Sequence, residues 1–404
     1  MQMREFLKAG HPPTLFASFL YFDVSFMIWV LLGPLGVSIA KDLGLSPAQK
    51  GLMVALPYLA GAIARFFLGM SVDRLGAKRT GTFAQLAVIA GLGWAWFANI
   101  HSLGQVHVLG TILGVAGASF AVALPLASRW YPPEAQGLAM GIAGAGNSGT
   151  VFSALFAPLL ARSFGWNAVI GMAAVPAIVA FLAFQFLAKD APDQPPPKTL
   201  AQYGAVLKDR DTWWFMLFYS VTFGGFSGLA ASLVIYFNAQ FGIDAVHAGY
   251  LAAACVLAGS LARPVGGRVA DMMGGATSLQ VMYLVAAISM GLVALSAHSL
   301  PGSVLFFVLG MLGLGMGNGA VFQIIPQRFR KEIGLLTGLV GMAGGFGGFY
   351  LATSLGYAKQ LTGSYQPGFL VFAGLALVAL AGLMGVKGRW RSTWGSSALT
   401  TARI

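Results

Sequence analysis

The sequence predicts an all-α membrane protein with twelve transmembrane helices arranged in two six-helix bundles of related structure. Three observations support this prediction: the composition, the spacing of the apolar runs, and an internal repeat. Of the 404 residues, 57% are hydrophobic and only 9% are charged, whereas a typical soluble domain is about 25% charged. The apolar runs are long and continuous, so they indicate helices rather than the short alternating strands of a β-barrel.

The apolar runs number twelve, and each is long enough to cross a bilayer core, which takes about 20 helical residues. We expect spans near residues 14–38, 50–71, 79–99, 104–128, 136–160, 166–188, 212–238, 247–270, 277–297, 302–326, 333–357 and 366–387. A long polar, proline-rich segment separates the first six from the last six. The predicted parts are an N-terminal bundle (1–188), a cytoplasmic linker (189–211), a C-terminal bundle (212–387) and a cytoplasmic tail (388–404).

The distribution of basic residues predicts the orientation. With the N-terminus inside, 18 of the Lys and Arg residues fall on the cytoplasmic side and 4 on the outer side. Because cytoplasmic loops carry the excess of positive charge, we expect both termini in the cytoplasm and the chain in the inner membrane. The net charge of +12 is this bias summed over many loops, so it does not indicate a nucleic-acid partner.

One stretch recurs in both halves and carries an arginine inside a span each time. Residues 56–76 match residues 258–274 at a constant offset, which pairs Gly61 with Gly259, Arg65 with Arg263, Gly69 with Gly267, Asp73 with Asp271 and Gly76 with Gly274. Both copies run in the same direction through the membrane, so they are parallel repeats about an axis along the membrane normal. A guanidinium in hydrocarbon is costly and marks a functional site.

The paired arginines predict a site for a small anion. A guanidinium stays charged and presents a flat fork of donors, whereas lysine binds as a point charge. The alternative is that Arg65 forms a structural ion pair with a buried acid. Asp23 is the one acidic residue inside a predicted span, and Arg263 has no such partner. The repeat therefore favours a substrate site over two unrelated salt bridges.

Asp23 lies about nine residues into the first span, about 14 Å from its cytoplasmic end, at a depth comparable to that of Arg65. It is either a static partner of Arg65 or a proton-coupling site. Burial and a nearby arginine shift the pKa of a carboxyl group in opposite directions. Proton coupling requires a group whose protonation depends on whether an anion occupies the arginine.

The turn GMSVDRLGAKR, residues 69–79, resembles the loop motif of the major facilitator superfamily. This resemblance implies the major facilitator fold and a conformational latch formed by Asp73, Arg74, Lys78 and Arg79, which would pair across the two halves in one conformation. The alternative is a charge cluster that only sets the topology. The second copy keeps Asp271 but lacks the basic residues.

Two glycine-rich segments, residues 141–158 and 338–352, resemble the signatures of the nitrate/nitrite porters (the NarK-type family). That family places one arginine in the second helix and one in the eighth around the anion, positions that Arg65 and Arg263 occupy here. It also has an aromatic pair in the seventh helix, which Tyr219 and Phe223 match.

The resemblance and the residue chemistry extend the predicted substrate site. Asn147 can donate an amide hydrogen to an oxyanion, and Tyr219 can donate its hydroxyl. Phe223 and Phe120 can form walls for a flat ion, although core packing or lipid contact explains them equally well. Gly144 and Gly344 permit close backbone approach to the anion, with helix packing as the alternative.

The function implied is import of nitrate, with nitrite as a second substrate, by alternating access in a functional monomer. Asp23 favours coupling to protons over exchange for nitrite. A carrier of another small anion is the nearest alternative. A nitrate receptor should carry a soluble output domain or a long interaction tail, and it is discounted because the basic tail here is short. We expect no enzyme activity, no cofactor and no metal site, since neither a metal-ligand cluster nor a nucleotide-binding loop is present.

Overall fold

The computed structural model describes residues 3–192, 199–296, 298–329 and 333–394. Within these ranges all regular structure is helical. The elements are α1 (Met3–Lys8), α2 (Pro12–Trp29), α3 (Gly36–Leu43), α4 (Pro47–Leu75), α5 (Ala77–Ala98), α6 (Leu103–Gly117), α7 (Phe120–Ser128), α8 (Pro133–Gly144), the 3-10 helix η1 (Ala145–Ser148), α9 (Gly149–Phe164), α10 (Trp166–Met172), α11 (Ala174–Leu187), α12 (Leu200–Lys208), α13 (Arg210–Phe241), α14 (Ala245–Met273), α15 (Gly275–Leu295), α16 (Leu300–Arg328), α17 (Ile333–Thr362) and α18 (Gln366–Trp394).

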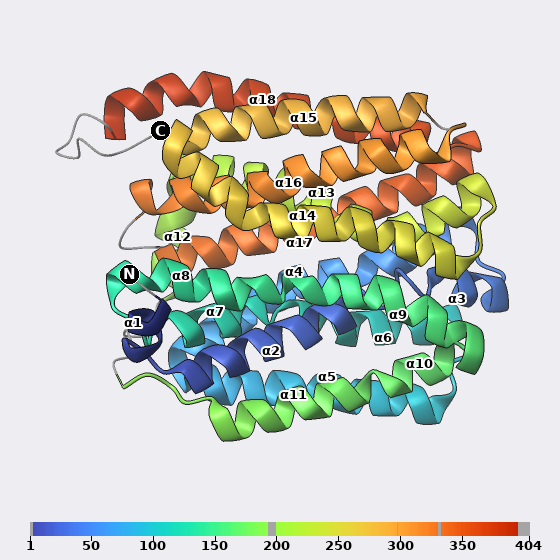
Figure 1. The fold of residues 1–404 in the computed structure, drawn as a ribbon, viewed down its shortest axis with the longest axis horizontal. Helices are drawn as coiled ribbons and strands as arrows, with labels where there is room; N and C mark the ends of the chain where they lie inside the picture. The colour runs from blue at the N-terminus through green and yellow to red at the C-terminus, as the bar shows by residue number, and fades with distance from the viewer. Residues whose placement is uncertain (1–2, 193–198, 297, 330–332, 395–404) are drawn as a thin grey trace.

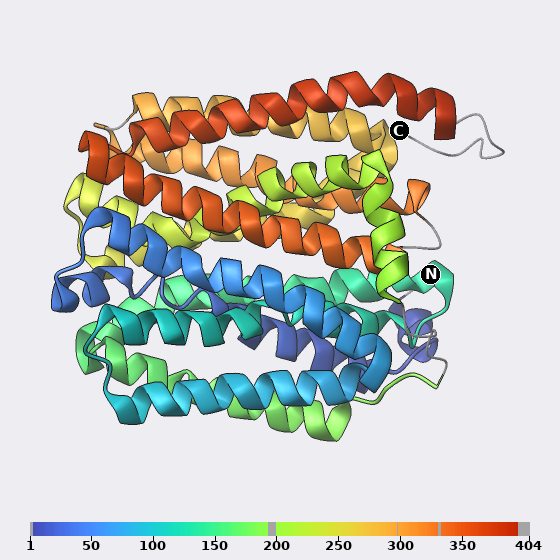
Figure 2. The same cartoon turned by 180° about the vertical axis from the view of Figure 1, so that it is seen from behind.

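The long helices lie side by side along one direction and form two groups (Figure 1). Helices α2 to α11 make up one group and α13 to α18 the other, while the short helix α12 lies between the groups at one end (Figure 2). Both ends of the chain lie at this same end, which we call the termini end. An even number of crossings places the termini together in this way.

Ten of the expected spans are helical segments long and apolar enough to cross a membrane, counted over the described residues. Four expected spans are not continuous helices: the fourth is divided into α6 and α7 and the sixth into α10 and α11, and the first and the fifth, which are not among these ten, are divided as well. The first span is split into α2 and α3 by a turn that contains Gly33 and Pro34, because proline cannot donate a helical hydrogen bond. The fifth is divided into α8, η1 and α9 in its glycine-rich part, where helix propensity is low.

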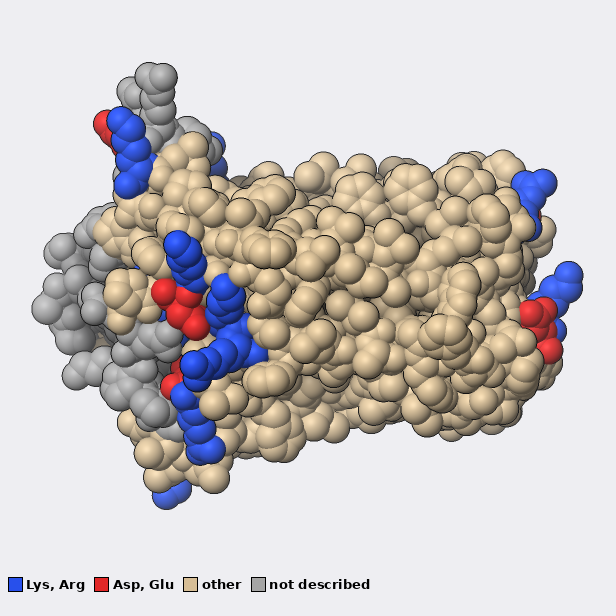
Figure 3. Space-filling model, turned by 90° about the horizontal axis from the view of Figure 1, so that it is seen from below, with Lys and Arg blue, Asp and Glu red and all other residues tan. Residues whose placement is uncertain are grey.

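On the face shown in Figure 3, the charged residues gather at the two ends, and a broad uncharged region lies between them. Large apolar side chains on the surface are strongly exposed, among them Phe97 at 88% and Phe186 at 79%. In water this exposure would be unfavourable, whereas in a bilayer the hydrocarbon is the solvent for such side chains. The surface is therefore that of a multi-pass membrane protein.

Glycines set the distance between the helices, and the two halves use them in the same way. A Cβ atom added to Gly114 would lie 2.7 Å from the backbone nitrogen of Gly61, where α6 crosses α4. A Cβ atom added to Gly315 would lie 2.0 Å from the carbonyl oxygen of Gly259, where α16 crosses α14. Small residues at such crossings let the backbones approach closely, so the repeat in sequence is also a repeat in packing.

The two halves meet backbone to backbone at the end opposite the termini. There a Cβ atom added to Gly51 in α4 would lie 2.8 Å from the Cα atom of Gly356 in α17. The backbone nitrogen of Ala48 donates a hydrogen bond to Oε1 of Gln360 at 3.0 Å. The halves are thus closed against each other along this seam between α4 and α17.

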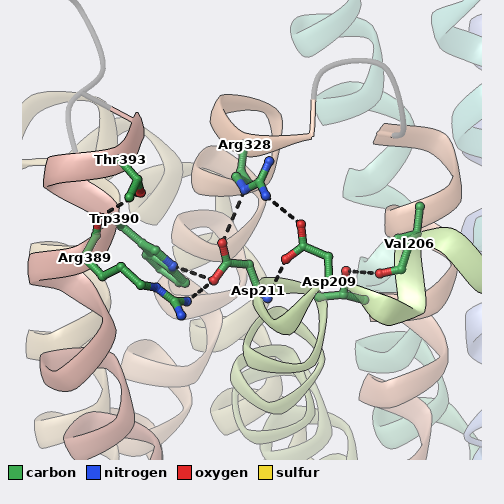
Figure 4. A network of polar contacts seen from close by, with 8 residues as sticks. Val206, Asp209, Asp211, Arg328, Arg389, Trp390 and Thr393 are labelled. Atoms are coloured by element: carbon green, nitrogen blue, oxygen red, sulfur yellow. Dashed lines mark hydrogen bonds and ion pairs between the residues drawn. The ribbon is translucent and has the colours of Figure 1, made fainter. Parts of the chain in front are cut away.

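A network of charges ties together the helix ends of the C-terminal half at the termini end (Figure 4). The buried carboxylate of Asp211 accepts hydrogen bonds from Arg328 Nε at 3.3 Å and Trp390 Nε1 at 2.8 Å, and it also pairs with Arg389. Asp209 accepts from Arg328 Nη2 at 2.6 Å. These contacts join α13, α16 and α18, so the three helix ends are held as one unit.

We predict that Gly266→Ala destabilises the protein and that the neighbouring Gly267→Ala does not. A Cβ atom at Gly266 would lie 2.1 Å from the carbonyl oxygen of Met316, whereas the same atom at Gly267 meets nothing within 4 Å. Overpacking costs about 1–3 kcal/mol, while Gly→Ala at an open helical position gains up to about 1 kcal/mol. Thermal unfolding of both variants in detergent would reveal the difference, and equal midpoints would contradict this packing.

Candidate functional site

Arg65 lies at the centre of the molecule and is only 2% exposed. Its Nε donates a hydrogen bond to the carbonyl oxygen of Gly117 at 3.0 Å, and its Nη1 donates to the carbonyl oxygen of Gly341 at 2.6 Å. Its Nη2 is also buried and has no hydrogen-bond partner among the described residues. A buried charged donor without a partner is costly, so this nitrogen marks a site suited to an acceptor.

The Gly117 carbonyl can accept from Arg65 because the helix breaks at this point. Between α6 and α7 the chain tightens, and the backbone nitrogen of Ala121 bonds to the carbonyl of Ala118 rather than to that of Gly117. The last carbonyl groups of a helix need partners from outside the helix. The break therefore supplies one neutral acceptor to the guanidinium.

Three aromatic rings surround the same guanidinium. The Cζ atom of Arg65 lies 5.1 Å from the ring centroid of Trp29, 5.2 Å from that of Phe223 and 5.7 Å from that of Phe120. A cation within about 6 Å of a ring centroid is attracted by the ring, most strongly at desolvated sites. The aromatic rings and the carbonyl groups thus stabilise a charge in the interior, and no carboxylate of the described residues pairs with it.

Trp29 is held in a slot between α4 and α6. Its Nε1 donates a hydrogen bond to the carbonyl oxygen of Pro57 at 2.9 Å. A Cβ atom added to Gly61 would lie 3.1 Å from the indole nitrogen, and one added to Gly117 would lie 2.4 Å from it. The indole fits only because both positions lack a side chain, and this fit fixes the ring beneath Arg65.

Arg263 occupies the related position in α14 but is less enclosed. It is half-buried, and its Cζ atom lies 5.8 Å from the ring centroid of Phe322. Arg263 is close enough to Tyr219 and to Arg65 to interact electrostatically with both. Its Nη1 is buried and has no partner among the described residues. Each half therefore contributes one unpaired guanidinium nitrogen.

Tyr219 and Phe223 form one aromatic surface on α13. Their rings are stacked with centroids 5.1 Å apart and an interplanar angle of 5°. A Cβ atom added to Gly344 would lie 2.8 Å from each ring. Phe223 is 2% exposed and Phe120 is 5% exposed, so neither ring faces lipid. The structure thus brings together Arg65, Arg263, Tyr219, Phe223, Phe120 and Gly344 from the predicted set.

Two predicted site residues lie apart from this cluster. Asn147 is 3% exposed, and its Oδ1 has no hydrogen-bond partner in the described part of the chain. The position of a Cβ atom at Gly144 is open, with nothing within 4 Å. Both belong to the region around η1, and no described contact joins either of them to the two arginines. Their assignment to the substrate stays a prediction.

Asp23 faces the same region around η1. Its Oδ1 accepts a hydrogen bond from Ser148 Oγ at 2.7 Å. Within the described residues no ion pair joins Asp23 to Arg65. The static Asp23–Arg65 pair is therefore not present in this conformation.

The four predicted latch residues lie at the termini end, and their observed partners belong to the same half or to the start of the linker. Asp73 pairs with Arg129 at 3.2 Å. Lys78 donates from Nζ to the carbonyl oxygen of Gln185 at 2.8 Å and from its backbone nitrogen to Asp190. Arg74 and Arg79 are exposed. Pairing across the halves is not observed among the described residues in this conformation.

Two further residues of the cluster, Trp29 and Phe322, were not predicted from the sequence. Phe322 covers Arg263 as Phe120 covers Arg65, and the repeat could have indicated it, since both phenylalanines lie a few residues before the related prolines Pro125 and Pro326. Trp29 gave no such signal. Its role depends on the slot between two helices that are far apart in the sequence.

Comparisons with known proteins agree with this architecture. The family model described as Major Facilitator Superfamily matches residues 14–352. The "Nitrite extrusion protein" of Bacillus subtilis is 31% identical, over 88% of this chain and 89% of that protein. The "Probable nitrate/nitrite transporter NarK2" of Mycobacterium tuberculosis is 33% identical, over 88% of this chain and 91% of its own length.

Among solved structures, a bacterial homologue of the human lysosomal transporter Spinster, in an inward-facing and unoccupied conformation, superposes with a TM-score of 0.72. It is 18% identical, and the match covers 95% of this chain and 98% of that one. At this identity the likeness concerns the fold alone.

Proposed function

Because the chain belongs to the major facilitator superfamily and, within it, to the nitrate/nitrite porters, we propose that it carries nitrate and nitrite across the cytoplasmic membrane. One observation supports this proposal most directly. The two halves contribute equivalent arginines, and each arginine has a buried guanidinium nitrogen that finds no partner in the part of the chain that the structure describes. The guanidinium of Arg65 lies over the ring of Phe223, which is stacked on that of Tyr219, and both arginines interact electrostatically with Tyr219.

The chemistry of nitrate suits this arrangement. Nitrate is flat, carries one negative charge and is weakly hydrated, so removing its water costs less than for most oxyanions. Two guanidinium forks can donate charge-assisted hydrogen bonds to its oxygens. The ring surface of Tyr219 and Phe223 provides a flat apolar wall. The two arginines alone could also bind another small anion, so a carrier of such an anion is the alternative.

We infer that transport occurs by alternating access between an N-terminal half (1–188) and a C-terminal half (212–387) in a monomer. The more basic termini end in Figure 3 faces the cytoplasm under the positive-inside rule, so both termini are cytoplasmic. The seam of Gly51 and Gly356 then forms the outer gate, closed in this conformation. In the opposite conformation Asp73, Arg74, Lys78 and Arg79 act as the latch on the cytoplasmic side.

The proposed direction is import coupled to protons. An anion that moves inward against a negative-inside potential meets about 2.3 kcal/mol per 100 mV, so accumulation needs co-transported protons. Asp23 is a carboxyl group in the interior with a neutral partner, the hydroxyl of Ser148. Exchange for internal nitrite needs no protons and is the second candidate. The name of the Bacillus subtilis relative, a nitrite extrusion protein, favours this candidate.

We predict that Arg65→Lys and Arg263→Lys each reduce nitrate uptake by at least about tenfold while insertion and folding are retained. An ammonium group cannot reproduce the fork, and a hydrogen bond to a charged group contributes about 1.5–3 kcal/mol, which corresponds to about 10- to 150-fold. Uptake into proteoliposomes measures the effect. The control is Arg268→Lys, because Arg268 is an exposed arginine on the same helix as Arg263. Near-normal uptake in either test variant would rule out the anion clamp.

We predict that an inward proton gradient drives nitrate uptake by the unmodified protein and that Asp23→Asn abolishes this response. Asn cannot release or bind the proton, but it preserves the size of the side chain. Asp244→Asn is the matched control, because Asp244 is an exposed N-cap and Asn caps a helix about as well as Asp. Uptake that ignores the gradient and requires internal nitrite would establish an exchanger. If neither condition gives uptake, other small anions become the candidates.

A further inference from the structure

Arg65 already has acceptors and aromatic partners supplied by the protein, and all of them are neutral. We propose that the Gly341 carbonyl and the Trp29 ring hold Arg65 whenever no anion is bound, so that the carrier can change conformation empty and perform net transport. This inference rests on the proposed function and specifies the transport mode of that same site.

The hydrogen bond to Gly341 joins the two halves of the molecule. Arg65 belongs to α4 and Gly341 belongs to α17, and the distance from Nη1 to the carbonyl oxygen is 2.6 Å. An anion that binds the fork competes for the same donor hydrogens. The carbonyl therefore substitutes for the anion: it gives the guanidinium an acceptor from the opposite half and draws the halves together without a counter-ion.

Trp29 supplies the second part of this support. Its ring lies 5.1 Å from the guanidinium carbon of Arg65 and stacks at 6.3 Å and 11° on Phe223, which belongs to the other half. The hydrogen bond to Pro57 and the slot at Gly61 and Gly117 keep the ring in place. The guanidinium thus rests on a fixed aromatic surface that extends across both halves.

Arg263 has fewer such partners, and this asymmetry assigns different tasks to the two arginines. Arg263 is half-buried, lies over the ring of Phe322 and interacts electrostatically with Tyr219. Arg65 is 2% exposed and has two carbonyl acceptors and three rings. Arg263 is therefore the arginine that the anion meets while still hydrated, and Arg65 is the arginine whose charge must be balanced before the halves can close.

This support has a consequence for the transport cycle. Two buried positive charges that only an anion could balance would prevent the empty carrier from closing, and such a carrier could only exchange one anion for another. Because neutral protein groups stabilise the charge of Arg65, the empty carrier can return to the conformation that binds the next anion. The cycle then moves anions in one net direction. The test must therefore compare net uptake with exchange in the same vesicles.

The experiment uses proteoliposomes that contain the full-length chain. Net uptake is measured with labelled nitrate outside and none inside under an inward proton gradient, and exchange is measured with unlabelled nitrate inside. We expect Trp29→Leu to lower net uptake at least tenfold and to leave exchange within about twofold. Trp29→Phe keeps an aromatic ring and should restore most of the net uptake. Trp166→Leu, a second buried tryptophan in the N-terminal half, should leave the ratio of the two rates unchanged.

A second variant and a binding measurement separate this role from a structural one. In Gly341→Val the Cβ atom would lie 3.7 Å from Phe120 and 3.9 Å from Cδ of Arg65, so the two added methyl groups would displace these side chains. This variant should likewise lower net uptake and leave exchange nearly unchanged. Nitrate affinity should stay unchanged or increase in the Trp29→Leu variant, because a competing partner of Arg65 is weakened. A loss of affinity would instead make Trp29 a substrate contact and overturn the inference.

The remaining outcomes are equally decisive. A parallel decline of net uptake and exchange in the Trp29→Leu and Gly341→Val variants, or no decline in either mode, would overturn the inference and leave nitrate transport itself intact. So would an unmodified protein that performs exchange but no net uptake. An unmodified protein that moves no nitrate in either mode would instead remove the proposed function.

Discussion

The structure of the interior depends on one constraint, which is that a buried guanidinium must keep partners. Arg65 lies where the charge cannot be solvated by water, and no carboxylate balances it among the described residues. The break between α6 and α7 supplies one carbonyl, α17 supplies another, and three rings enclose the group. The break between α6 and α7, which leaves the Gly117 carbonyl without a helical partner, thus serves to hold the side chain of Arg65.

The same constraint explains the distribution of glycines around the centre. Gly61 and Gly117 make room for the indole of Trp29, and Gly344 makes room for Tyr219 and Phe223. Each glycine removes a side chain where a ring must lie close to a backbone. The aromatic rings in turn cover the charge. Glycines thus serve two purposes in this chain: they let helices cross closely, and they make room for a few large side chains.

The sequence was sufficient for the order of spans and for the pair of arginines, since hydropathy and an internal repeat are both local patterns. It was insufficient for the breaks in the first and fifth spans, because hydropathy averaged over a window does not register a turn such as that at Gly33 and Pro34. Nor could it identify the carbonyl groups of Gly117 and Gly341 as partners of Arg65. Every residue has a carbonyl group, and only the packing of distant helices selects which one is used.

The seam between Gly51 and Gly356 has a thermodynamic consequence for how the halves separate. Side chains that become ordered at an interface lose rotamer freedom, whereas glycine has none to lose. A seam made largely of backbone therefore closes at little entropic cost and opens with little entropic gain. The balance between its two positions is then sensitive to small enthalpic differences, such as the single hydrogen bond from Ala48 to Gln360.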